Sequence, residues 1–240
     1  MKEILHLYKE EWIRFKTRYL KLFLLALLLF FVVAVVSYAV LLGRPEFTEQ
    51  KFIELAERLM AKVPLDKGLL MTAVGILISN FTAVCLVVGL GIIPFLFLPA
   101  FGVSLNGGAM GVLTAFLTIR GVDLGPVLLY GLLPHGIFEI PAFLYAATLG
   151  IGLCLGMTRF ILKEFFGRGG TADQSQPGDP VSPEKNPYRS SSTESFADLW
   201  RHTLRSFALV IVPLLLLAAA IEAFITPALI RTFIGNLDLL

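Results

Sequence analysis

Long apolar runs, separated by short polar segments, dominate the pattern of the chain. A helix needs about 20 consecutive apolar residues to cross a bilayer core of about 30 Å. Five stretches reach that length, at residues 20–42, 69–93, 99–119, 126–151 and 206–226. The pattern therefore predicts an all-α fold, a polytopic transmembrane helix bundle with about five spans, in which residues 20–157 form a first membrane domain.

Residues 1–19 carry a different pattern, in which large apolar side chains recur every three or four positions with Lys and Glu between them. The stripe consists of Ile4, Tyr8, Trp12, Phe15 and Tyr19. Such spacing predicts an amphipathic helix lying at the membrane interface. The alternative is that the stripe packs against the cytosolic face of the protein itself, and the sequence leaves both readings open.

Three polar segments connect or precede the spans. Residues 46–63 predict a short external helix, with Thr48 as its N-cap and Pro64 ending it. Residues 167–195 are rich in Gly, Ser, Pro and Asp, a composition that predicts a disordered cytosolic loop. Residues 196–228 predict an amphipathic lead-in that continues into the last transmembrane helix.

Composition and charge place the protein in a membrane and orient it. Apolar residues make up 56 % of the chain and charged residues 16 %, with a mean hydropathy of +0.79, which excludes an ordinary soluble domain. Residues 1–21 hold six Lys or Arg, and residues 158–205 hold seven. With five spans these segments share one side, so the positive-inside rule predicts a multi-pass protein of the cytoplasmic membrane with a cytosolic N-terminus.

Few strongly polar side chains fall inside the predicted spans. The carboxylates and imidazoles there are His135, Glu139 and Glu222, and two amides join them, Asn80 and Asn106. A carboxylate in hydrocarbon is unfavourable by about 3 kcal/mol, so we expect these five residues to form an intramembrane polar cluster.

Two prolines bracket His135 and Glu139 in the fourth span. Pro134 and Pro141 have no N–H to donate to the carbonyl four residues earlier, so we expect the helix to be broken there. Two G-x-x-x-G pairs predict close helix packing: Gly107 with Gly111, and Gly152 with Gly156.

The polar cluster admits three roles. The first is a hydrogen-bonded network that fixes helix packing, and the second is a proton relay or ion path. The third is metal binding, because His135, Glu139 and Glu222 could supply three ligands. The chain contains no H-E-x-x-H motif and no cysteine pair with metal-ligand spacing. We therefore predict no metal site, no cofactor and no catalytic residue, and a phosphate-binding loop and a G-x-S-x-G elbow are also absent.

Several segments within the predicted spans also resemble a known family. Residues 132–143, Leu-Leu-Pro-His-Gly-Ile-Phe-Glu-Ile-Pro-Ala-Phe, resemble the central motif of the stage II sporulation protein M family. Ser79-Asn80 and Leu105-Asn106-Gly107 are similar to two further motifs, with Ser79 and Leu105 departing from the usual residues. Residues 220–227 are similar to the closing motif of the family.

The resemblance implies a polytopic membrane protein without known enzymatic activity. The namesake of the family works with partner peptidoglycan hydrolases at the septal membrane, as an anchor or scaffold in cell-envelope remodelling. We therefore expect a non-enzymatic membrane scaffold or complex subunit, whose partners are the lipid bilayer and either other proteins or a second copy of the chain, and not nucleic acid. The alternative is a permease-like or export-associated subunit with a polar path lined by His135, Glu139 and Glu222.

Overall fold

The structure is a computed structural model that describes residues 2–61, 68–166 and 196–233. Throughout these three ranges the regular elements are helices, and no strand occurs among them. The predicted disordered loop, residues 167–195, and the predicted helix end at Pro64 lie outside the described residues.

The elements follow one another along the chain with few interruptions. In order they are α1 (Lys2–Arg14), η1 (Phe15–Tyr19), α2 (Leu20–Leu42), α3 (Pro45–Met60), α4 (Leu69–Leu90), α5 (Leu98–Ile119), α6 (Leu124–Pro126), η3 (Val127–Leu132), α7 (Leu133–Phe166), α8 (Phe196–Ser206), η5 (Phe207–Ile211), α9 (Val212–Ala220), η6 (Ile221–Ile225) and α10 (Thr226–Phe233), where η marks a π-helical turn. Several of these elements join end to end into single long helices.

Five helices of the described residues are long and apolar enough to cross a membrane. They are Leu5–Leu42, Leu69–Leu90, Leu98–Ile119, Leu124–Phe165 and Ala197–Phe233. Each contains one of the five predicted spans or nearly all of it, which confirms the all-α polytopic bundle. The first and last are longer than predicted because α1 and α8 continue directly into the spans that follow them, and the fourth is longer because α7 extends to Phe166.

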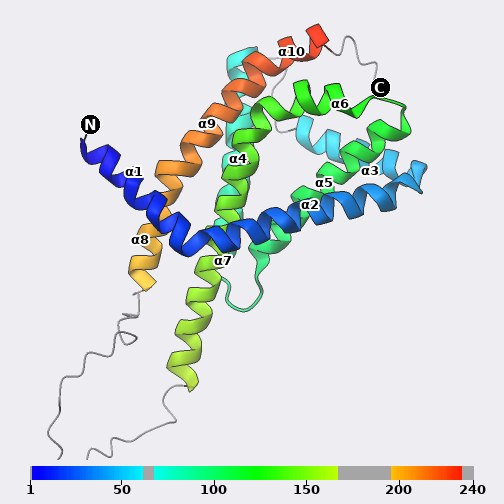
Figure 1. The fold of residues 1–240 in the computed structure, drawn as a ribbon. Coiled ribbons are helices and arrows are strands. Elements are labelled where there is room, and N and C mark those ends of the chain that lie inside the picture. Colours follow the sequence, from blue (N-terminus) through cyan, green and yellow to red (C-terminus); the bar gives the residue numbers. More distant parts are fainter. Residues whose placement is uncertain (1, 62–67, 167–195, 234–240) are drawn as a thin grey trace, which may run out of the picture.

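Helix α7 forms the centre of the bundle. Its most apolar window is 56 % buried inside the protein, against 22–33 % for the other four candidate spans. Helices α2, α4, α5 and α9 all pack against it, as Figure 1 shows around the green α7 ribbon. Small and medium side chains such as Ala142, Ala146 and Leu149 are almost fully buried along α7, so its neighbours approach its backbone closely.

The structure corrects the predicted break at Pro134 and Pro141. Helix α7 runs through Pro141 without interruption, and the irregular part is η3, which ends two residues before Pro134. In η3 the N–H of Leu133 donates to the carbonyl of Leu128, five residues earlier. Because a carbonyl in this wider register accepts from the fifth residue ahead, a proline in the fourth position removes no hydrogen bond from it. The π-helical turn therefore allows the helix to continue past Pro134. Helix α7 also continues past Pro141, where one carbonyl lacks its usual helical donor.

The predicted external helix is α3, with one correction at its start. The helix begins at Pro45, a residue that suits the first position of a helix, and not at an N-cap on Thr48. Thr48 is fully buried, and its hydroxyl donates to the carbonyls of Leu41 at 2.8 Å and Arg44 at 3.0 Å. These bonds fasten α3 to the end of α2. Phe52 then stacks on Phe116 of α5, with ring centroids 3.8 Å apart.

One part of the amphipathic stripe of residues 1–19 packs on the protein, and the other part is exposed as an interfacial helix would be. Tyr19 is buried, and Phe15 makes edge contacts with Phe23 and Tyr145, so this end packs on the protein. Trp12 and Tyr8 are 56 % and 43 % exposed. Their positions leave the first two turns of the stripe available to an interface.

Candidate functional site

The centre of the candidate site is a cluster of three ionisable side chains from two helices, His135, Glu139 and Glu222. His135 and Glu139 stand one turn apart on α7, and Glu222 comes from η6 in the last span. One ring nitrogen and one oxygen of each carboxylate all lie within 4.8 Å of one another. The fold thus brings together three of the five polar residues that the sequence singled out.

Local backbone irregularity accompanies the cluster on both helices. The π-helical η3 ends just before Pro134 and His135, and Glu222 lies inside the π-helical η6. A π-helical turn inserts one extra residue into a helix and rotates the side chains on either side of it, and such turns are frequent at functional sites. Each of the two helices thus has a π-helical turn within a few residues of its cluster side chain.

Within the cluster, the imidazole of His135 is the group that forms a hydrogen bond. His135 is 9 % exposed, and its Nδ1 lies 3.4 Å from the hydroxyl oxygen of Thr226. That hydroxyl donates in turn to the carbonyl of Ile221 at 3.3 Å. We assign the Nδ1–H tautomer to His135, because a hydroxyl that donates its one proton to Ile221 accepts from the ring, and this assignment leaves the Nε2 lone pair free.

The two carboxylates have no such partners. Across residues 2–61, 68–166 and 196–233, neither Glu139 nor Glu222 forms a hydrogen bond or an ion pair with another side chain. Two carboxylates a few ångströms apart at membrane depth repel each other when both are charged. The site therefore requires protons or a cation to be stable.

A cavity of about 480 Å³ opens beside Glu139. Its walls come from α2, α3, α5, η3 and α7, and they are apolar apart from Glu139 and Asn106. Asn106 is exposed on α5, and its side-chain amide donates to the carbonyl of Gly102 at 3.4 Å. The fourth predicted polar residue thus shares a cavity with the cluster without touching the imidazole.

The fifth predicted polar residue, Asn80, is half-buried on α4. Helix α4 packs against both α9 and η6, so Asn80 belongs to a helix adjacent to the cluster. Among the described residues, the Asn80 side chain forms no hydrogen bond with His135, Glu139 or Glu222.

The predicted glycines lie where helices approach each other. A Cβ at Gly107 would lie 2.5 Å from the carbonyl oxygen of Phe30, and one at Gly111 would lie 2.5 Å from Cβ of Ser37. Both glycines therefore allow α5 to pack directly on α2. Gly152 faces the ring of Tyr19, and Gly156 faces Leu199 of α8.

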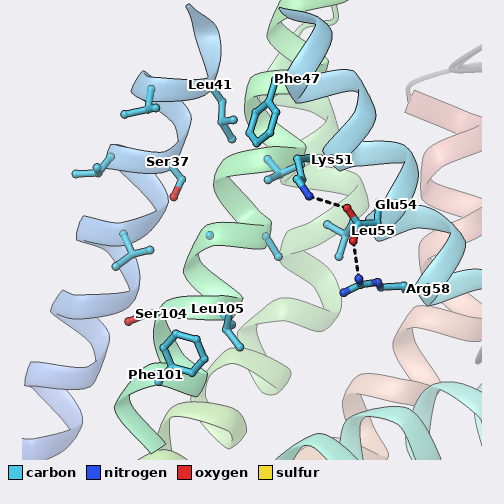
Figure 2. A pocket seen from close by; sticks show the side chains of 16 residues that line it. Ser37, Leu41, Phe47, Lys51, Glu54, Leu55, Arg58, Phe101, Ser104 and Leu105 are labelled. Carbon is cyan, nitrogen blue, oxygen red and sulfur yellow. Dashed lines mark hydrogen bonds and ion pairs between the residues drawn. The ribbon is translucent and has the colours of Figure 1, made fainter. Parts of the chain in front are cut away.

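A second concavity of about 660 Å³ lies between α2, α3 and α5. Figure 2 shows its apolar walls, with Lys51, Glu54 and Arg58 following one another along α3 at one edge. Lys51 donates to Glu54 at 2.8 Å, and Arg58 pairs with the other oxygen at 2.5 Å. The hydrogen bond from Lys51, aided by both positive charges, lowers the pKa of Glu54 below its usual range.

Sequence reasoning missed a polar contact at the other end of the bundle. Glu11 is 2 % exposed, and it accepts from the hydroxyl of Ser206 at 2.5 Å. Arg205 pairs with Glu11 at 2.9 Å and with Glu10 at 2.5 Å, which joins α1 to α8. The amphipathic pattern places Glu11 on the polar, solvated face of the helix. Its partners Arg205 and Ser206 lie far away in the sequence, so the pattern alone carries no signal for this contact.

The chemistry available at the cluster follows from its three groups. An imidazole with a free Nε2 and two unpaired carboxylates can exchange protons, link two helices through shared protons, or ligate a cation. The described residues that line the adjacent cavity include no hydroxyl, thiol or amine.

Comparison with known protein families gives a match. The family model SpoIIM, described as Stage II sporulation protein M, matches residues 25–227, a range that includes the whole cluster. Neither the comparison with curated proteins nor the comparison with solved structures gave a match.

Proposed function

The chain belongs to the stage II sporulation protein M family, and from this premise we propose that it is a non-enzymatic integral membrane scaffold or complex subunit. In this role it anchors or organises partner proteins at the cytoplasmic membrane. The observation that carries the proposal is the position of the cluster, where His135 and Glu139 of α7 meet Glu222 of η6. There the polar groups join the central helix to the last span.

The surroundings of the cluster support a structural role over a catalytic one. The cavity beside Glu139 offers Asn106 and apolar walls, with no nucleophile among its described lining residues. A hydrolase needs a nucleophile or an activated water held next to a base and a site for the developing charge. A polar contact between two helices needs none of these, because its role is to select one packing arrangement.

The proposed topology places the N-terminus in the cytosol. The segments richest in Lys and Arg are residues 1–21 and 158–205. Support comes from the ion pairs of Arg205 with Glu10 and Glu11, because they hold α1 and α8 at the same end of the bundle. In this arrangement the exposed Leu5 and Trp12 face the lipid interface of the cytosolic leaflet, and α3 lies outside.

Affinity isolation of the full chain from native membranes tests the proposal. The scaffold function predicts that cell-wall hydrolases or other envelope-remodelling enzymes are recovered with the chain in a mild detergent. Arg205→Ala is a useful companion variant, because it removes the two ion pairs between α8 and α1 at the cytosolic end and leaves α3 intact. In the proposed topology α3 lies outside, so enzymes that dock on α3 should still be recovered with this variant.

A permease-like or export-associated subunit is the second candidate. The cavity of about 480 Å³ favours it, because Glu139 and Asn106 place polar groups inside an otherwise apolar space between helices. Recovery of a cytosolic ATPase in place of envelope enzymes would support this candidate. Recovery of neither class from membranes that contain the folded chain would contradict both functions.

A further inference from the structure

The cluster on α7 and η6 presents the donor atoms that transition metals prefer. One imidazole nitrogen and two carboxylate oxygens converge within 4.8 Å from segments more than 80 residues apart in the chain. Mixed nitrogen and oxygen donors suit zinc and its neighbours in the first transition series, whereas magnesium and calcium prefer oxygen ligands throughout. The donor set therefore selects a class of cation.

The hydrogen bonds around His135 supply a second, independent observation. The hydroxyl of Thr226 donates to the carbonyl of Ile221 and so accepts from Nδ1 of His135. Metal-binding histidines are usually held in this way, with one ring N–H donated to a neighbouring oxygen and the other nitrogen free for the metal. His135 is 9 % exposed, and its Nε2 has no hydrogen-bond partner among the described residues.

Charge balance points in the same direction. Glu139 and Glu222 have no cationic partner in the described part of the chain. A divalent cation would neutralise both carboxylates at once, which removes the cost of keeping two negative charges at membrane depth. Donor atoms around a tetrahedral zinc ion at about 2.0–2.2 Å lie roughly 3.3–3.6 Å from one another. The three donor atoms lie within 4.8 Å of one another, so zinc binding requires the side chains to draw together by about 1 Å.

Against the expectation from the sequence of no metal site, we propose from these observations that His135, Glu139 and Glu222 bind one divalent transition-metal cation, with zinc as the best-matched ion. Three protein ligands leave at least one coordination position open. The cavity beside Glu139 gives that position room for water or for a polar group of another molecule. The proposal does not depend on the scaffold function, since the metal would join α7 to the last span whatever partners the protein has.

The test uses the full chain, purified in detergent without a polyhistidine tag and stripped with a chelator. We expect elemental analysis after dialysis against buffered Zn²⁺ to give about one zinc per chain, and no stoichiometric uptake of Mg²⁺ or Ca²⁺. Free zinc at about 100 times the dissociation constant should raise the melting temperature by roughly 5–10 °C. Absence of zinc uptake by the folded chain would overturn the proposal.

Isosteric variants assign the site. Glu139→Gln and Glu222→Gln keep the shape of a neutral carboxyl group but ligate poorly, so we expect each to weaken zinc binding at least tenfold. Thr226→Val leaves the ligands in place and removes the hydroxyl that orients His135, so we expect about a 10-fold to 100-fold loss of affinity. Glu54→Gln on α3 is the matched control and should leave zinc binding unchanged.

Two results distinguish the metal site from a proton-shared contact. If the carboxyl groups are neutral in the native state, the two Gln variants and the wild type will melt at the same temperature with or without zinc, and the proposal fails. It also fails if zinc binds but Glu139→Gln and Glu222→Gln retain full affinity, because the ion then lies elsewhere. Partner recovery from membranes is a separate measurement, so it tests the scaffold function independently.

Discussion

Gly107→Ala on α5 is expected to destabilise the protein, whereas Gly108→Ala at the next position is not. A Cβ at Gly107 would lie 2.5 Å from the carbonyl oxygen of Phe30 and 3.3 Å from Cβ of Val33, both on α2. The first of these is a backbone atom, so relief requires the two helices to move apart. At Gly108 the nearest atom to a new Cβ would be the hydroxyl of Ser37, at 3.9 Å, which is ordinary contact.

The magnitude follows from the difference between these neighbouring positions. Both substitutions gain the same helix propensity, about 1 kcal/mol for alanine over glycine, so that gain cancels in the comparison. Overpacking against an immobile backbone costs about 1–3 kcal/mol. For a chain of this length each kcal/mol corresponds to about 2–4 °C in melting temperature. Gly107→Ala should therefore melt about 2–12 °C below Gly108→Ala.

The assay is thermal unfolding of both purified variants in the same detergent. Unfolding is followed by an optical signal that does not rely on a thiol-reactive dye. Gly111→Ala provides a second test, because its Cβ would lie 2.7 Å from the carbonyl oxygen of Ala34. Equal melting temperatures for Gly107→Ala and Gly108→Ala would refute the direct packing of α5 on α2.

Three further predictions concern the ends of the bundle. Phe52→Ala removes the ring that stacks on Phe116 and should lower the free energy of unfolding by about 2–4 kcal/mol. We expect faster hydrogen exchange of residues 45–60, and unchanged exchange would contradict this prediction. Arg205→Ala removes the ion pairs that join α8 to Glu10 and Glu11 of α1, and leaves Glu11 paired only with Arg14 of its own helix. It should speed hydrogen exchange of residues 2–14, and the same exchange as in the wild type would mean that these ion pairs do not hold α1. The hydrogen bond from Lys51 lowers the pKa of Glu54, so the stability it contributes is present above pH 4.5 and is lost as the pH falls through the lowered pKa. Melting curves of Glu54→Gln should therefore change less below pH 4.5 than those of the wild type, and identical pH dependence would refute this assignment.

The membrane fold was predictable because its signal is local. A span is defined by about 20 consecutive apolar residues, and the length of each run can be counted without knowing its neighbours. The same reasoning found His135, Glu139 and Glu222, because ionisable groups are rare and costly at membrane depth and tend to meet. The structure brings these three together and places Asn106 on the cavity beside them.

Features that depend on distant parts of the chain or on fine backbone geometry were not predictable. A π-helical turn before Pro134 lets α7 continue, and no residue pattern announces a register change of this kind. Gly91 packs against the backbone of Gly150 on α7, although neither glycine belongs to a predicted pair. Glu11 is buried because Arg205 and Ser206 reach it from α8, and a helical pattern read on α1 alone shows a solvated acid.

The melting temperature of His135→Ala, measured on the purified full chain beside the wild type, tests the claim that the cluster joins α7 to the last span. The variant loses the hydrogen bond to Thr226 and leaves a cavity beside Glu139 and Glu222, a cost of about 2 kcal/mol. The account predicts a fall of about 4–8 °C, with a parallel loss of partner recovery from membranes. If His135→Ala abolishes the function of the protein in cells while its melting curve and its complex with partners are unchanged, the claim that the cluster joins the two helices is contradicted.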